Sequence, residues 1–407
     1  MNLPLFIARK YFLSKKKKNF INVISVISMA GVAIGTAALV IVLSVFNGLE
    51  DLIRSLNKSF DPELKIEAAL GKSFELQQDF LEGIKRIEGV EIVTQVVEDN
   101  AYARYKNDEM VVKLKGVEDN FVDHHRLDSN IIYGKMLLKE DGVNYAVIAR
   151  GVQKSLSINK LNNMYTMQFF YPKRGKTSGL NPNNLTNQRV ILPAGVYAIE
   201  KQYDMNYVFV PLEFAVDLLD YGQRRTSLEI KVAAGANIDQ VKSRIKKFAG
   251  DDFKVLTSDE IHADFFKVLQ IEKLFVFIIF SFILAIASFN IFFSLTMLAI
   301  DKKKDISILA ALGSGKKLIK RIFLAEGAII SFMGAFLGLF LGMTICLVQQ
   351  HFGLVSMGMQ TAVIDAYPVK MQFPDFLYTG ISIIIITLLA SYRPAVIASR
   401  TTMRDHI

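Results

Sequence analysis

Four long apolar stretches limit what this chain can fold into. They cover residues 21–48, 271–300, 322–350 and 376–392, and crossing a bilayer takes about 20 apolar residues. Residues 49–270, between the first two stretches, are polar, which explains why only 51% of the 407 residues are hydrophobic. The sequence therefore predicts a membrane protein in which one span precedes a large outer domain and three spans follow it.

The positive charges indicate which segments face the cytoplasm. The formal net charge is +9, and the basic residues gather before the first span, between the second and third, and after the fourth: Arg9, Lys10, Lys15–Lys18, Lys302–Lys304, Lys316, Lys317, Lys320, Arg321, Arg393, Arg400 and Arg404. Short cytoplasmic loops are rich in Lys and Arg. Both termini (1–20 and 393–407) and the loop 301–321 are therefore predicted to be cytoplasmic, with the domain 49–270 and the loop 351–375 outside. Because these charges set the topology, no nucleic-acid partner is expected.

The outer domain combines strand and helix patterns. Residues 63–68 alternate apolar and polar side chains as a strand does, and 76–87 have helical spacing. Two long strands then flank a turn at Asn107-Asp108, and a helix at 237–250 precedes a last strand. This order predicts a two-lobed α+β domain. The single cysteine, Cys346, lies in the third span, so the domain has no disulfide. Before the first span, residues 3–13 suit a short interfacial helix.

One segment of the domain, 171–188, is much longer than a hairpin turn needs. It holds two prolines, two glycines and four asparagines and lies between two strand-like segments. It is either a simple insertion or an arm that protrudes to bind a partner.

Small and aromatic residues mark faces of the spans. Gly31 and Gly35 form a pair in the first span, and Gly334, Gly338 and Gly342 recur every four residues in the third. Such glycines allow close helix packing. In the second span Phe275, Phe282 and Phe289 recur every seven residues and share a face. That stripe either faces lipid and neighbouring helices or contacts an apolar substrate.

Catalytic motifs are missing from the sequence. Gly315-Lys316 resembles part of a P-loop, but the loop needs glycine where Ala310 stands and Ser or Thr where Lys317 stands. No ATP site is therefore expected in this chain. His124 and His125, near Asp123 and Asp128, would point apart on a strand, so no metal site is expected. Glu326, near the end of the third span, is a functional candidate by its depth. A structural ion pair with Lys320 or Arg321 is the simpler interpretation.

Two segments resemble the FtsX/MacB-type permeases of ABC transporters. The run "KDISILAALG" is similar to the family's R-E-I-x-I-L-R-x-x-G-A run, although Asp305 replaces the usual Glu and Ala310 the usual Arg. The end of the chain resembles the family's closing P-A-x-x-A-s-R signature at Pro394, Ala395, Ala398 and Arg400, with Met403 in place of a later proline. "VLSVFNGLE" (42–50) is more similar to the lipoprotein-releasing LolC/LolE branch than to other branches.

The resemblance implies a function for several of these segments. In this family the 301–321 loop docks on a separate ATPase subunit, which holds the ATP and Mg²⁺; the residues implied here are Lys304, Asp305, Ile308, Leu309, Leu312 and Gly313. In the lipoprotein-releasing branch, an arm of the periplasmic domain captures a carrier protein; its counterpart would include Tyr171, Pro172, Leu180 and Pro182. Val45 and Phe46 would line a substrate cavity with the phenylalanine stripe.

The expected protein is thus a multi-pass subunit of the bacterial inner membrane, itself without cofactor. It would extract lipoproteins and pass them to a periplasmic carrier, and it would pair with a second permease copy or a paralogue. Extracting acyl chains costs about 0.8 kcal/mol per CH₂, so ATP hydrolysis by the partner is needed. The alternatives are a MacB-like exporter of drugs or peptides, an FtsX-like regulator of cell-wall hydrolases, and a membrane-anchored sensor.

Overall fold

The computed structural model describes residues 3–12, 20–159, 161, 165–173, 186–199, 205–357 and 366–400. The chain divides into two compact units. One is helical and comprises the described residues up to Leu52 and those from Phe265 onward. The other is Ile53–Asp264.

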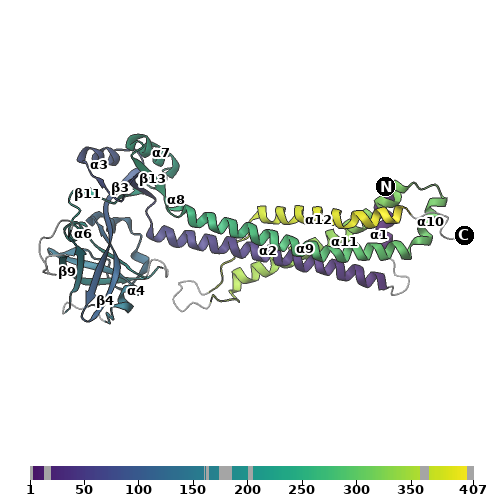
Figure 1. Cartoon of the computed structure of the whole chain (residues 1–407), viewed down its shortest axis with the longest axis horizontal. Helices are drawn as coiled ribbons and strands as arrows, with labels where there is room; N and C mark the ends of the chain where they lie inside the picture. Colours follow the sequence, from purple (N-terminus) through teal and green to yellow (C-terminus); the bar gives the residue numbers. More distant parts are fainter. Residues whose placement is uncertain are drawn as a thin grey trace. The chain divides into compact units, whose positions relative to one another are not determined.

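The helical unit contains α1 (Leu3–Phe12), α2 (Phe20–Phe60, up to Leu52), α9 (Ala263–Asp301, from Phe265), α10 (Lys303–Ala311), α11 (Lys316–Phe352) and α12 (Phe373–Ser399). Four of these, α2, α9, α11 and α12, are long and apolar enough to cross a membrane, and they run side by side (Figure 1). This confirms the predicted order of one span followed by three.

The bundle is held by apolar side chains at its centre and by small residues where helices approach. Leu39, Leu43, Leu284, Ile291 and Ile330 form its middle core. A second cluster, at the end where α10 lies, includes Ile306, Ile319, Phe323, Ala395 and Ala398. The sequence predicts that the last span ends at residue 392 and that residues 393–407 form a cytoplasmic terminus, but α12 continues to Ser399. Ala395 and Ala398 are fully buried, so packing maintains the helix beyond Pro394.

The smaller lobe of the second unit is a four-stranded antiparallel sheet in the order β13 (Phe253–Thr257), β1 (Leu64–Ala68), β12 (Ser227–Val232) and β3 (Val90–Tyr105). Helices α3 (Gln78–Lys85) and α7 (Ile238–Ala249) pack on it and on each other (Figure 1). Leu64, Ile66, Ile84, Ile230 and Ile245 are fully buried between them. Asn237 caps the start of α7, because its side chain accepts hydrogen bonds from two backbone N–H groups of the first turn. α8 (Ser258–Ile261) follows β13.

The larger lobe is a closed ring of six strands. Beyond β3, these are β4 (Asp108–Val117), β10 (Tyr207–Pro211), β7 (Val143–Ala149), β9 (Thr186–Tyr197) and β8 (Met167–Pro172). β8 closes the ring because it pairs with both β9 and β3. The remaining elements are not part of the ring: β5 (Ile131–Gly134), β6 (Lys139–Glu140), α4 (Arg150–Ser155), α6 (Leu212–Leu219), η1 (Asp119–His124) and η2 (Asp128–Asn130). Two further short strands, β2 (Phe74–Glu75) and β11 (Arg224–Arg225), pair with each other. The predicted two-lobed α+β domain is confirmed.

Candidate functional site

The predicted coupling segment is the short helix α10, which lies at one end of the bundle with α1 (Figure 1). Ile306 is 1% exposed and anchors the helix in the apolar cluster of α9, α11 and α12. Ile308 and Leu312 are 60% and 78% exposed. Lys304, Asp305 and Gly313 are also exposed, and Leu309 is half-buried. α10 is thus anchored on one face and presents apolar side chains on another, as a docking helix requires.

The P-loop-like stretch after α10 is a turn between helices. Gly313 has φ +87°, and its N–H donates to the carbonyl of Ala310 at 3.0 Å, while the N–H of Ser314 donates to that of Leu309 at 3.0 Å. These two bonds form a Schellman motif, the usual glycine end of a helix. Gly315 then precedes the first turn of α11. The N–H groups of Gly313 and Ser314 are used by the helix end, so they are not available to cradle a phosphate.

Three glycines of α11, spaced four residues apart, lie against the backbone of α2. A Cβ atom at Gly334, Gly338 or Gly342 would be 2.8, 2.4 or 3.2 Å from the carbonyl oxygens of Met29, Ala33 and Ala37. Gly31 and Gly35 of α2 face α9 instead, since a Cβ at Gly35 would lie 2.8 Å from Leu284 and one at Gly31 would lie 3.8 Å from Ala287. α2 therefore packs closely against both neighbours.

The residues predicted for a substrate cavity lie in different places. Phe275, Phe282 and Phe289 are exposed on α9. Val45 lines a cavity of about 490 Å³ between α2, α11 and residues that follow α11, and none of the three phenylalanines lines it. Phe46 is half-buried. Within one chain the stripe and the end of the first span therefore do not share this cavity.

The predicted carrier arm begins later and ends earlier than its sequence suggested. Tyr171 and Pro172 belong to β8 and pair with Asn187 and Thr186 of β9. The two strands of the hairpin therefore extend into the segment that the sequence predicts as a loop. Leu180 and Pro182 lie outside the described residues. The Tyr171 hydroxyl donates to Asp99 at 2.9 Å. Tyr171 thus connects the hairpin to β3 of the closed ring.

Asp99 is the centre of that anchor. It also accepts a hydrogen bond from the Tyr221 hydroxyl at 2.9 Å and pairs with Lys72. Burial raises the pKa of Asp99, but the hydrogen bonds from Lys72, Tyr221 and Tyr171 outweigh this and lower it. The carboxylate stays charged, and three segments of the chain meet on it.

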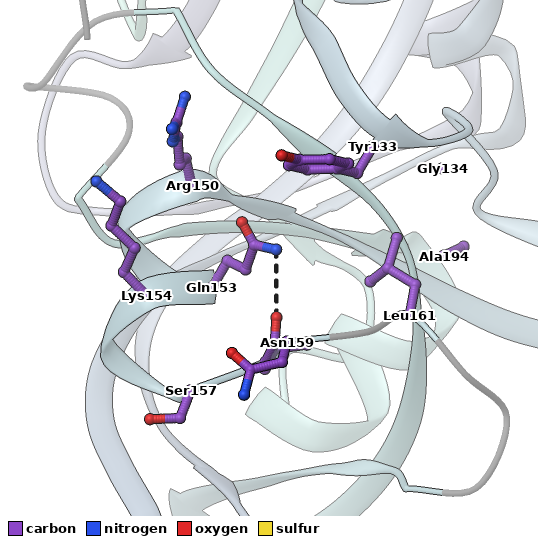
Figure 2. Close-up of a pocket in the computed structure, with 10 residues that line it drawn as sticks. Tyr133, Gly134, Arg150, Gln153, Lys154, Ser157, Asn159, Leu161 and Ala194 are labelled. Atoms are coloured by element: carbon purple, nitrogen blue, oxygen red, sulfur yellow. Dashed lines mark hydrogen bonds between the residues drawn. The ribbon is translucent and has the colours of Figure 1, made fainter. Parts of the chain in front are cut away.

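A polar hollow of about 950 Å³ lies beside α4 (Figure 2). Arg150 and Lys154 extend from α4 in the same direction, and the hydroxyl of Tyr133 points toward Arg150 and Gln153 (Figure 2). The Gln153 amide donates to the carbonyl of Ile158 at 3.2 Å. Among the described residues, the lining of the hollow contains the cations Arg150 and Lys154 together with neutral groups. The hollow therefore suits an anionic group.

The two adjacent histidines lie apart, though not for the reason that the sequence suggested. They end a 3-10 helix and do not lie on a strand. His124 is buried and shares a hydrogen bond with Thr94 at 2.8 Å, whereas His125 is exposed and pairs with Asp128 at 2.7 Å. In the described ranges no group of three or more His, Cys, Asp or Glu side chains could hold a metal ion.

A buried charge cluster in the outer domain was missed by sequence reasoning. Glu229 is 2% exposed and pairs with Lys115 at 2.6 Å and with Arg126. Lys115 follows Leu114 on β4, and Glu229 lies between Leu228 and Ile230 on β12, so the alternation places both charges on the polar face and gives no signal that they are buried.

Glu326 does not form the expected ion pair in the described part of the chain. It is 2% exposed, and its Oε2 atom has no hydrogen-bond partner there. Lys320 instead lies 4.1 Å from the ring centre of Tyr392. The helical turn places Glu326 on the inward face of α11, away from the exposed Arg321.

Family comparisons match both parts of the chain. Residues 25–248 match the family described as MacB-like periplasmic core domain, and residues 277–403 match the FtsX-like permease C-terminal family. Among solved structures, the periplasmic region of MacB from Actinobacillus actinomycetemcomitans is similar at 17% identity, with 51% of this chain and 94% of that chain covered and a TM-score of 0.37.

Curated relatives match almost the whole chain. It is 24% identical over 403 residues to the lipoprotein-releasing system transmembrane protein LolC of Buchnera aphidicola, covering 98% of this chain and 96% of that protein. It is 23% identical over 413 residues to the protein named LolE of Haemophilus influenzae, covering 97% and 96%.

Proposed function

Because this chain belongs to the family of ABC transporter permeases that join a MacB-like periplasmic core domain to an FtsX-like C-terminal region, we propose that it releases lipoproteins from the inner membrane. In this proposal the chain is a non-catalytic subunit with both termini in the cytoplasm. A separate ATPase subunit binds ATP and Mg²⁺, a second permease copy or a paralogue completes the membrane part, and a periplasmic carrier receives the lipoprotein.

The observation that carries the proposal is the extent of the similarity to lipoprotein-releasing proteins. It covers 98% of this chain and 96% of the Buchnera protein, so it includes the outer domain as well as the spans. A MacB-like exporter or an FtsX-like regulator would share the spans and the coupling helix. A MacB-like exporter would share the outer domain as well, so it is the full-length similarity to relatives named for lipoprotein release that favours this function.

Helix α10 supports the use of an external ATPase. Its exposed Ile308 and Leu312 are four residues apart, so they lie on one face of the helix. Neighbouring apolar side chains at the end of a membrane bundle suit burial in a pocket of a partner protein. Because Ile306 is fixed in the bundle core, a movement of α10 would pass to α9, α11 and α12.

The test is a release assay with the complete transporter. The chain is purified with its co-purifying ATPase and permease partners and placed in liposomes that contain a triacylated lipoprotein. The expected result is ATP-dependent transfer of the lipoprotein to a soluble carrier, and no hydrolysis by the permease chain alone. Retention of the lipoprotein, with ATP-dependent transport of a drug or peptide, would instead support the exporter.

A further inference from the structure

Three polar side chains from three different spans meet in the bundle. Asn47 of α2 donates from Nδ2 to Asp375 Oδ2 of α12 at 2.6 Å. Lys273 of α9 donates to Asn47 Oδ1 at 2.7 Å and lies 3.0 Å from Asp375 Oδ1. Asn47 is 1% and Asp375 is 6% exposed. We call this set, Asn47, Lys273 and Asp375, the outer polar cluster.

The cluster is satisfied by its own members, which argues against a ligand site. Lys273 also lies 3.2 Å from the second oxygen of Asp375, and the Asn47 amide donates to the carbonyl of Lys370 at 3.2 Å. Asn47 thus accepts from the cation and donates to the anion, and these partners fix one orientation of its amide. What remains is a role in holding the three helices.

Stability alone is a poor explanation for charges at this position. The Lys273 side chain is 25% exposed, but the Asp375 carboxylate is buried. Removing a carboxylate from water is expensive, and a well-packed apolar set is often as stable or more stable. Hydrogen bonds and ion pairs between helices are more specific than apolar contacts, because they form in only one register of the helices. They are lost together when the helices separate.

The location of the cluster is specific. α2 and α9 are the helices that precede and follow the outer domain in the sequence, whereas α12 follows α11. The segment before α12 is held on α2 as well, because the Lys370 N–H donates to Ser44 at 2.9 Å. A Cβ at Gly48 would lie only 2.4 Å from the carbonyl oxygen of Pro368. The cluster therefore fastens α2 and α9, which flank the outer domain in the sequence, to α12.

We propose that Asn47, Lys273 and Asp375 are positioning residues that hold α2 and α9 against α12 in the resting permease and separate during each transport cycle. The proposal rests on the proposed transport function. In it, the cluster prevents the outer domain from moving until ATP binding supplies the force. Breaking the cluster would allow movement without that supply, so hydrolysis and transport would lose their coupling.

The first test measures helix separation and does not depend on the cargo. In a Cys346→Ser background, spin labels are placed at Gln270→Cys of α9 and Tyr378→Cys of α12, which line the groove beside the cluster. In the complex with its ATPase, the label distance is expected to increase when ATP binds. Asp375→Asn is expected to give the longer distance without ATP. An Asp375→Asn complex with the wild-type distances in both states would overturn the proposal.

The second test measures coupling as ATP hydrolysed per lipoprotein released. Asp375→Asn and Lys273→Met are expected to raise this ratio severalfold, and the exchange Lys273→Asp with Asp375→Lys is expected to bring it back toward wild type. Asp51→Asn is the control, since Asp51 forms an exposed ion pair with Lys370 outside the cluster. Single variants that only lower the yield of folded complex, with an unchanged ratio, would show a purely structural role. If the wild-type complex releases no lipoprotein, the proposed function fails, while the distance measurement still decides on the cluster.

Discussion

At the scale of single residues, the outer domain depends on charges that have no access to water. Glu229 is fully buried, and Lys115 and Arg126 are its partners. Burial raises the pKa of Glu229, but the two cations outweigh it and lower the pKa to about 2. Arg126 also donates to the carbonyl of Phe60 at 3.1 Å, at the end of α2. The cluster thus links two strands to the helix that enters the domain.

Glu229→Gln should strongly destabilise the domain. The variant leaves two buried cations without their anion, which typically costs roughly 3–5 kcal/mol. Thermal unfolding of the purified chain, followed by calorimetry or by near-UV circular dichroism of its tyrosines, measures the loss of stability. Glu213→Gln is the control, because its exposed pair with Lys139 contributes little. Equal unfolding temperatures for the two variants would contradict this reading of the cluster.

His124 should make the domain sensitive to mild acid. Burial, and then the charge of Arg126, lower its pKa from 6.5 to about 4. The unfolded chain therefore binds this proton at a higher pH than the folded one, and stability falls as the pH drops from about 6.5 toward 4, by roughly 1–3 kcal/mol. His124→Gln should flatten this part of the stability profile. His125→Gln, at the exposed neighbour, should not; if it does so equally, His124 is not the cause.

At the scale of elements, the sequence was most informative where one physical rule dominates. Apolar length predicted the four spans, and the helix predicted at 237–250 is α7, which Asn237 caps. The predicted limits of the loop, 171–188, were wrong. The composition around Tyr171 and Pro172 indicates a loop, whereas pairing with β9 makes these residues part of a strand. The spacing of Gly334, Gly338 and Gly342 indicated a shared face but not which helix it meets.

Gly338→Ala should disturb the helix bundle. Its new Cβ would lie 2.4 Å from the Ala33 oxygen and 2.6 Å from Thr36 Cβ, so α2 and α11 must separate. Gly380→Ala in α12 is a matched control, because a Cβ there meets nothing within 4 Å. That change removes a glycine from a helix and should be neutral or stabilising by up to about 1 kcal/mol. The unfolding temperature in detergent distinguishes them, and equal values would mean that the close contact carries no energy.

The exposed face of α10 should determine ATPase binding. Ile308→Asp or Leu312→Asp places a charge where an apolar pocket of the partner would close, without touching the buried Ile306. Loss of co-purified ATPase, at an unchanged amount of inserted permease, is the expected result. Lys316→Gln changes the net charge equally but lies beyond α10 and serves as control. ATPase recovery at the wild-type level from both aspartate variants would remove the docking assignment.

At the scale of the whole molecule, alternating strands and helices predicted two lobes but not the closed barrel. Closure requires β8 to pair with both β3 and β9, contacts between residues far apart in the sequence such as Ala103 and Phe169. No local pattern specifies such pairs. The outer polar cluster escaped prediction for the same reason, since Asn47, Lys273 and Asp375 are separated by hundreds of residues and each is unremarkable alone.

The hairpin of β8 and β9 offers the sharpest test of the whole transport scheme. Replacing residues 173–185 by Asn-Gly would join Pro172 and Thr186, which are paired, through a two-residue turn. The domain should stay folded, because Tyr171 keeps its hydrogen bond to Asp99. The ATPase should remain bound, while capture of the carrier by the full chain and lipoprotein release should stop. Tyr171→Phe, which loses that hydrogen bond and keeps the segment, is the control and should retain carrier binding. Full carrier recovery with the shortened hairpin would show that this segment is only an insertion and would favour a MacB-like exporter.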